Sequence, residues 1–158
     1  MTTREDLIDG FRLVIREAKR HTAVFGDADW ALPAQGNEGW NRKQAYGHVA
    51  ATAEIAPGFI GNLAQATEDQ NPMDGIDINS LNDQLIAGKQ QLSGKELVDN
   101  LVGSYEKLIE FTQGLPQDQL EARRNFGLLQ GGTLCDVMDS VLVVHAVAHI
   151  YSAGGNAA

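Results

Sequence analysis

Cysteine is nearly absent from this sequence: its 158 residues include only Cys135. A lone cysteine cannot form an internal disulfide, so packing must stabilise the fold. The lack of an internal disulfide agrees with a reducing compartment. Cys135 falls in the first turn of an expected helix, where the helix dipole can stabilise a thiolate. Because no basic residue lies within two positions on either side, we interpret it as a small, half-buried side chain without special reactivity.

Positive charge and long hydrophobic runs are also scarce. The 12 Lys and Arg residues face 21 Asp and Glu, and the net charge of -9 repels phosphate backbones and anionic membranes. The longest apolar run, residues 141–151, is interrupted by two histidines and is shorter than the roughly 18 residues of a membrane span. The amino-terminal Met-Thr-Thr-Arg-Glu-Asp-Leu lacks the apolar segment of a signal peptide. We therefore expect a soluble, cytoplasmic protein without nucleic-acid or membrane partners.

Strand-like alternation is missing as well, whereas five stretches have the apolar periodicity of amphipathic helices. Start signals stand at Thr2 with Glu5, Asn41 with Gln44, Ser93 with Glu96 and Thr133 with Asp136. These patterns predict helices over residues 3–25, 41–65, 79–91, 93–114 and 133–154.

Four of these helices are long, which predicts an all-α fold: a four-helix bundle in which residues 79–91 form a short extra helix in the middle connection. The length suits one domain over residues 1–158. Pro57 should kink or break the second helix. Residues 66–78 and the glycine-rich residues 116–132 are expected to be irregular connections.

The last helix carries the most informative pair, His145 and His149. Residues four apart project from one helix face about 6 Å apart along the axis, so both imidazoles can reach one small cation. The pair continues an apolar stripe that includes Met138 and Val141, with His149 at its edge, so both histidines are expected to face inward. A buried pair hydrogen-bonded to hydroxyls or carbonyls fits this spacing equally well.

A third histidine favours the metal interpretation. His48 lies about 60° from the centre of the apolar stripe of the second helix, at the border of the buried face. Three imidazoles from two helices would leave positions open for water or substrate, as in catalytic sites, and would suit Zn²⁺ or Ni²⁺. The fourth histidine, His21, lies among charged and polar residues near a helix end, where we expect a solvated surface position.

The sequence lacks the residues that other known metal-binding and nucleophile motifs require. A di-iron bundle needs Glu three positions before each histidine, but these positions hold Ala45, Leu142 and Ala146. The His-Glu-x-x-His, phosphate-loop and Gly-x-Ser-x-Gly patterns are missing too, although a Ser-His-Asp or Cys-His arrangement stays open. Three acidic residues are candidates for outer-shell carboxylates, but each is better explained as a solvated charge or a helix cap: Glu54, Asp136 and Asp139.

Several short motifs together resemble the DinB-like (YfiT-like) four-helix bundle superfamily. Trp40-Asn-Arg-Lys-Gln-Ala-Tyr-Gly-His48 resembles the opening of its second helix, and His145-x-x-x-His149, after Gly-Gly-Thr-Leu-x-Asp, resembles its closing motif. Leu81-Asn-Asp-Gln and Ser93-Gly-Lys-Glu-Leu97 are similar to its midsection. The resemblance implies a divalent metal, zinc or nickel, on the residues matching His48, His145 and His149, often in a homodimer.

Within this superfamily the chain is similar to the amino-terminal domain of mycothiol-dependent maleylpyruvate isomerases. That resemblance implies a metal that activates a low-molecular-weight thiol such as mycothiol, bacillithiol or glutathione. Two departures argue against isomerase activity: His145 stands where these enzymes typically carry glutamate, and the chain lacks room for their second domain. We expect a stand-alone thiol transferase or hydrolase-like metalloenzyme acting on a small molecule. The alternative is a non-catalytic, metal- or ligand-binding stress-response bundle.

Overall fold

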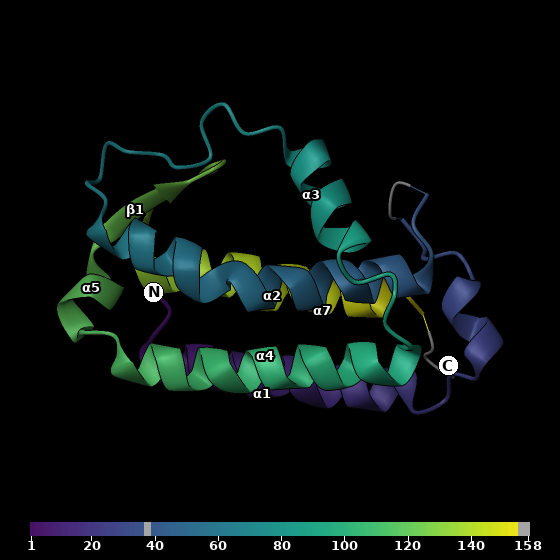
Figure 1. Cartoon of the computed structure of the whole chain (residues 1–158). Helices are drawn as coiled ribbons and strands as arrows, with labels where there is room; N and C mark the ends of the chain where they lie inside the picture. The colour runs from purple at the N-terminus through teal and green to yellow at the C-terminus, as the bar shows by residue number, and fades with distance from the viewer. Residues whose placement is uncertain (37–38, 155–158) are drawn as a thin grey trace.

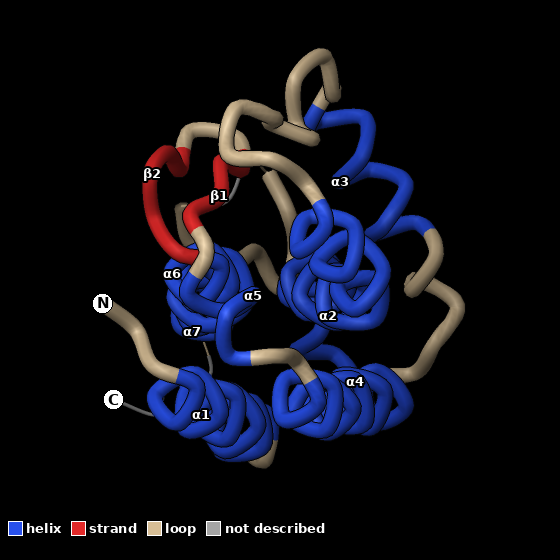
Figure 2. Tube along the Cα trace, turned by 90° about the vertical axis from the view of Figure 1, so that its left-hand side faces the viewer, coloured by secondary structure: helices blue, strands red, loops and turns tan. Residues whose placement is uncertain are grey.

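The computed structural model describes residues 1–36 and 39–154, and four long helices dominate it. Viewed end-on, they stand at the corners of a bundle, with α1 beside α4 and α2 beside α7 (Figure 2). The short helix α3 lies outside the bundle against α2 (Figure 1). The predicted all-α four-helix bundle is thereby confirmed. The long elements are α1 (Arg4–Thr22), α2 (Arg42–Gln65), α4 (Gly94–Gly114) and the continuous helix α6 (Leu134–Asp139), η2 (Ser140–Val144) and α7 (His145–Ser152); α3 is Ile78–Ala87.

Capping boxes set where the long helices begin. Those at Asn41, Ser93 and Thr133 are confirmed. At the first helix the prediction was one residue early, because Thr3 and Asp6 form the box in place of Thr2 and Glu5. Two capping patterns overlap there, and the backbone N–H of Thr2 donates instead to the Asp136 carboxylate at 2.9 Å. This bond ties the start of the chain to the last long helix.

The last long helix changes its pitch in the middle. Residues Ser140–Val144 form a π-helical turn, in which the N–H of His145 donates to the carbonyl of Ser140. A π turn inserts one extra residue and rotates everything beyond it. The stripe expected to continue through Val141 and Ala148 therefore moves by about one position, and Leu142, Ala146 and Ile150 are the buried residues. The prediction that His145 lies on the core stripe and faces inward is wrong for this reason, whereas His149, expected at the edge of the stripe, is half-buried.

Two contacts hold the π turn against the bundle. The buried Tyr105 of α4 donates its hydroxyl to the carbonyl of Leu142 at 2.6 Å. On the other side Gly10 of α1 faces Val143, and a Cβ at Gly10 would stand 2.8 Å from a Val143 methyl. Only glycine allows this approach, so the sequence of α1 accommodates the turn.

Pro57 does not break α2, contrary to one of the outcomes expected. The helix runs from Arg42 through Pro57 to Gln65. Proline removes one backbone N–H but leaves the flanking turns intact, and Ala53, Ala56 and Ile60 around it are buried in the core. The packing of these residues in the core thus outweighs the free-energy cost of the backbone hydrogen bond lost at Pro57.

Residues 116–132 are also more regular than predicted. They contain α5 (Gln117–Glu121) and an antiparallel hairpin of β1 (Arg123–Phe126) and β2 (Leu129–Thr133), with an irregularity between Arg124 and Phe126. The Arg124 guanidinium donates to the carbonyls of Leu63 and Ala64 at 2.8 and 2.9 Å. These carbonyls belong to the last turn of α2, where carbonyls have no N–H donor four residues ahead in the helix; the carbonyl of Leu63 also accepts from the N–H of Ala66 at the C-cap. The hairpin therefore caps α2.

The hairpin also anchors the connection between α2 and α3. The Asn71 side chain donates to the carbonyl of Gly127 at 2.8 Å and accepts from the Gly127 N–H at 2.9 Å. The connection then arches over α2 from the hairpin to α3 (Figure 1). This arch becomes the roof of the cavity described below.

The helix Leu134–Ser152 is long and apolar enough to cross a membrane by length and composition, and 44% of its most apolar stretch is buried. This corrects the expectation that the histidines keep the stretch too short for that criterion. The helix packs against both α1 and α2. The core helix of a bundle has the same character, so this feature is weak evidence for a membrane span.

Candidate metal centre

Two helices bring three of the four histidines together. His48 lies in the second turn of α2 and is 4% exposed, whereas His149 is half-buried and His145 is exposed on the first turns of α7. Because the π turn rotates α7, His145 and His149 do not point to the centre of the bundle. They face α2 and the side of the molecule that α3 covers. The expected convergence on His48 is observed, but at the border of the core.

The three rings stand in mutual contact. The Nε2 atoms of His145 and His149 are 2.9 Å apart. The His48 ring centroid lies 5.1 Å from that of His145 and 4.9 Å from that of His149, both edge-on. One potential ligand nitrogen from each ring falls within 4.8 Å of the others. Tetrahedral ligands at 2.0–2.1 Å from Zn²⁺ stand about 3.3 Å apart, so small side-chain movements suffice to enclose an ion.

The hydrogen-bond inventory of this cluster is incomplete. Neither Nδ1 nor Nε2 of the buried His48 has a partner among the described residues, and neither has Nδ1 of His149. Buried polar atoms are nearly always paired, and an unpaired one costs about 1–3 kcal/mol. Nitrogen atoms left without partners in a group of three imidazoles are what a metal ion would satisfy. The residues present therefore fit a divalent metal.

All three imidazoles are held in the neutral form that binds metals. Burial lowers the pKa of His48 to about 3, with further lowering by His149 and His145. Burial, then the neighbouring His145, lowers the pKa of His149 to about 4. Desolvation also lowers the pKa of His145, against a hydrogen bond to the Val141 backbone that raises it. That bond occupies one ring nitrogen and leaves the other, facing His149, as the ligand atom.

An aromatic wall closes one side of the cluster, and the sequence analysis assigned it no role. Trp40, just ahead of α2, stacks on His149 with centroids 5.6 Å apart and lies 5.1 Å from the His48 ring. The spacing of eight residues between Trp40 and His48, about two helical turns, could have predicted that the two side chains lie on the same side of α2. Trp40 restricts the orientations of two of the three rings and shields them from water.

None of the proposed outer-shell carboxylates serves the cluster. Glu54 pairs with Lys89 and Asn100. Asp136 caps the last long helix and binds Thr2, at the far end from the histidines. Burial, then the charges of Asp136 and Asp6, raises the pKa of Asp139, which places it at that same far end. Among the described residues the group suited to a metal contains histidine alone.

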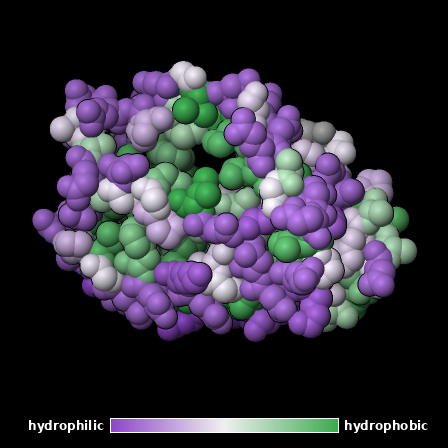
Figure 3. Space-filling view, in the orientation of Figure 1, coloured by the Kyte–Doolittle hydropathy of each residue, from purple (hydrophilic) through white to green (hydrophobic). Residues whose placement is uncertain are grey.

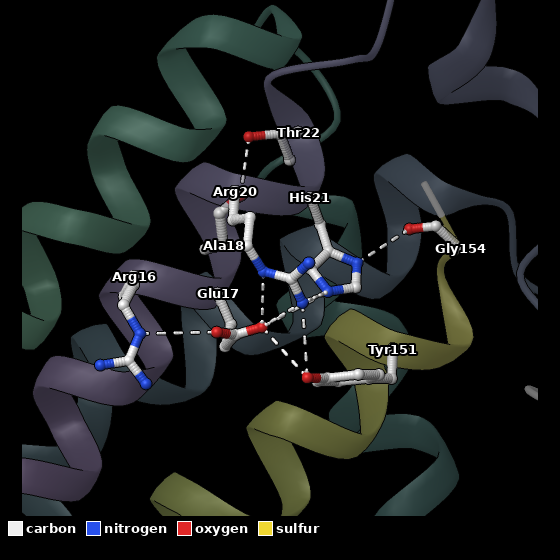
Figure 4. Close-up of polar contacts among 8 residues, drawn as sticks. All are labelled: Arg16, Glu17, Ala18, Arg20, His21, Thr22, Tyr151 and Gly154. Atoms are coloured by element: carbon white, nitrogen blue, oxygen red, sulfur yellow. Dashed lines mark hydrogen bonds and ion pairs between the residues drawn. The ribbon is translucent and has the colours of Figure 1, made fainter. Parts of the chain in front are cut away.

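The remaining candidates of the sequence analysis are not part of this site. Cys135 is buried, and burial raises the pKa of its thiol to about 11, so the inert interpretation is confirmed and its burial is more complete than expected. The prediction that His21 is solvated is wrong, because its side chain is 1% exposed. The end of α1 packs against the end of α7 there, and His21 lies 4.8 Å from the Tyr151 ring (Figure 4).

Fold and site together define a helical-bundle protein whose second and last long helices present a three-histidine group. The family of the mycothiol maleylpyruvate isomerase N-terminal domain matches residues 11–149, most of the chain, and the chain belongs to this DinB-like family. The match includes all three histidines. Comparisons with curated proteins and with solved structures gave no match.

Proposed function

We propose that this protein is a metal-dependent enzyme in which His48, His145 and His149 hold one divalent cation, Zn²⁺ or Ni²⁺. The proposal is carried by one observation: three imidazole nitrogens converge within 4.8 Å, and the ring nitrogens of the buried His48 have no hydrogen-bond partner in the part of the chain that the structure describes. Two ligands come from one turn of α7 and the third from α2. A protein that supplies only three ligands leaves a coordination position for water or a substrate.

The proposed reaction is transfer or hydrolysis of a small electrophile by a low-molecular-weight thiol or by water. A bound cation would lower the pKa of a thiol or water toward neutrality. Membership in a mycothiol-related family supports mycothiol as the thiol, with bacillithiol and glutathione as the other candidates. The protein's own residues keep the imidazoles neutral, orient His145 through Val141, and exclude water from one side through Trp40.

The first test is metal content. Protein purified without chelator and without a histidine tag should contain about one Zn²⁺ or Ni²⁺ per chain by elemental analysis, and His145→Ala should lose nearly all of it. His21→Ala is the matched control, since it removes a buried histidine outside the group and should keep the metal. Equal trace metal in wild type and His145→Ala would refute the site.

The second candidate function is a non-catalytic, metal- or ligand-binding bundle, which the missing carboxylate favours. No general base stands in the group, so a metal could serve there without turnover. Thiol-conjugation assays with mycothiol, bacillithiol and glutathione separate the two candidates. Turnover that His48→Ala abolishes would eliminate the non-catalytic candidate, whereas loaded metal without turnover of any substrate tested would favour it.

We also propose a cytoplasmic homodimer that binds small molecules and neither nucleic acid nor membranes. The net charge of -9 supports the exclusion of nucleic acid. Light scattering coupled to gel filtration would measure the assembly state, and a mass of one chain at micromolar concentration would contradict the dimer.

A further inference from the structure

An apolar cavity opens directly beside the three histidines. It lies between α2, α3, the hairpin and the arch, with a volume of about 290 Å³, and both His48 and His145 contribute to its wall. Figure 3 shows the same face hollowed below the arch, with hydrophobic side chains around the opening. The third histidine, His149, is turned toward Trp40.

The lining of this cavity carries no charge. Of its fourteen lining residues ten are apolar, and the polar ones are the two histidines, Thr52 and Asn82. None of the fourteen is Asp, Glu, Lys or Arg. A carboxylate that enters such a space loses its hydration and finds no cationic side chain in the lining, which costs several kcal/mol in the metal-free protein. With a metal ion on the histidines, only the end of the cavity beside them would offer a positive charge, and the rest of the wall would still favour an apolar body.

The size of the cavity limits the ligand as well. A dry apolar cavity of about 150 Å³ binds benzene, so about 290 Å³ suits a bicyclic aromatic or a chain of comparable bulk. Its mouth is exposed and apolar too, since Ile55, Ile76 and Ile78 are 42%, 47% and 46% exposed. An apolar rim leading into an apolar cavity favours entry of an uncharged hydrophobic molecule from water.

We propose that this cavity binds an uncharged molecule with a hydrophobic, aromatic or medium-chain body and directs its polar end toward His48 and His145. As a substrate site it rests on the proposed function, and it narrows the substrate class. Maleylpyruvate, the acid in the family's name, carries two carboxylates and finds no Lys or Arg side chain in this lining. The specificity residues are then apolar wall residues such as Ile55, Phe59 and Leu85.

The test uses the neutral fluorescent probe N-phenyl-1-naphthylamine with the full chain, once freed of metal by chelation and once with one equivalent of Zn²⁺. We expect saturable one-site binding in both forms. The neutral competitor 2-naphthalenemethanol should displace the probe from both forms, whereas millimolar maleate or succinate should not displace it from the metal-free form. Saturable binding to the metal-free form that dicarboxylates displace, or no saturable binding at all, would overturn the proposal.

Two variants localise the probe. Ile55→Lys puts a charge at the mouth and Leu85→Trp fills the cavity from α3, and each should weaken probe binding by at least about tenfold. The control Val24→Lys changes a 58% exposed valine outside the lining and should alter the affinity by less than about twofold. Thermal melts of each variant verify folding. Unchanged probe affinity in both folded cavity variants would overturn the assignment.

This experiment separates the two proposals. Probe binding without any metal uptake would leave the cavity assignment intact and refute the metal enzyme. Metal uptake without probe binding would do the opposite. A concentration-dependent dimer whose formation is blocked by Ile55→Lys and whose assembly excludes the probe would identify the mouth as a self-association face and overturn the small-molecule assignment.

Discussion

The molecule has two polar clusters built around a buried histidine, His21 in one and His48 in the other, and they differ in how completely the hydrogen bonds of that histidine are satisfied. At the end of α1, His21 receives a hydrogen bond at Nε2 from Arg20 at 2.9 Å, and its Nδ1 faces the carbonyl of Gly154 at 3.4 Å (Figure 4). Glu17 accepts bonds from Arg20 and from Tyr151. In the other cluster, neither ring nitrogen of His48 has a partner within residues 1–36 and 39–154. The sequence predicts that His21 is solvated and that the other three histidines face inward, whereas His21 is the most buried of the four.

The difference indicates what each cluster is for. A satisfied polar network fastens one helix to another and has no capacity left for a ligand. The network of Glu17, His21 and Tyr151 joins α1 to α7 in this way. An unsatisfied group of neutral imidazoles costs stability until something binds it. Perturbation of the two clusters should therefore have different consequences, of which the largest concerns metal.

Zinc should stabilise the protein strongly, and only through the cluster of His48, His145 and His149. At a free concentration about 1,000 times the dissociation constant, a ligand of the native state adds about 4 kcal/mol, which for a chain of this length raises Tm by about 8–16 °C. Differential scanning fluorimetry of chelated protein with and without Zn²⁺ measures the shift. His48→Ala should abolish it, whereas His21→Ala should start from a lower Tm and keep it. A shift that survives in His48→Ala would contradict the metal centre.

Loss of the His21 cluster should lower the stability of the protein without affecting metal binding. His21→Ala removes a fully buried ring and its bonds to Arg20 and Gly154, so we expect the free energy of unfolding to fall by about 2–4 kcal/mol. Urea unfolding of the metal-free protein provides the value. Lys19→Ala, on the exposed side of the same helix, is the matched control and should change it by less than about 0.5 kcal/mol. Equal effects of the two variants would show that the network contributes nothing.

Acid should destabilise the metal-free protein through His48. The pKa of His48 is about 3 in the folded state and about 6.5 in the unfolded chain. Between these values the unfolded state binds a proton that the folded state does not, so stability falls as pH drops from 6.5 toward 3. From pH 7 to 5 this amounts to roughly 2 kcal/mol from His48. Urea unfolding at both pH values measures this loss. The free energy of unfolding of His48→Phe should fall correspondingly less between pH 7 and pH 5, and an equal fall in the variant and the wild type would contradict the prediction.

Much of the fold could be predicted from the sequence, because local signals and burial agree in the long helices. The caps at Asn41, Ser93 and Thr133 and the apolar stripes were sufficient for the bundle. The hairpin was missed because its strands are four and five residues long, and residues 129–132 lack alternation. Its stability comes from distant contacts such as Arg124 with the end of α2.

The candidate site was only partly predictable. The i, i+4 spacing of His145 and His149 was sufficient to place them together, but the π turn that rotates them has no local sequence signal and depends on Gly10 and Tyr105 from other helices. The burial of His21 did have a signal, since it lies three residues after Ala18 on the stripe of α1. Its charged sequence neighbours outweighed that periodicity in the prediction.

The smallest expected effect concerns a single hydroxyl of the satisfied cluster. Tyr151 donates to the Glu17 carboxylate at 3.1 Å but is 51% exposed, so water can replace part of the lost bond, and Tyr151→Phe should cost about 0.5–1.5 kcal/mol. Tyr46→Phe is the contrasting control: the buried hydroxyl of Tyr46 has no partner among the described residues, and its removal should be neutral or stabilising. Urea unfolding of both variants at pH 7 gives the comparison. A larger loss for Tyr46→Phe than for Tyr151→Phe would mean that hydrogen-bond satisfaction does not distinguish structural polar groups from binding groups in this bundle.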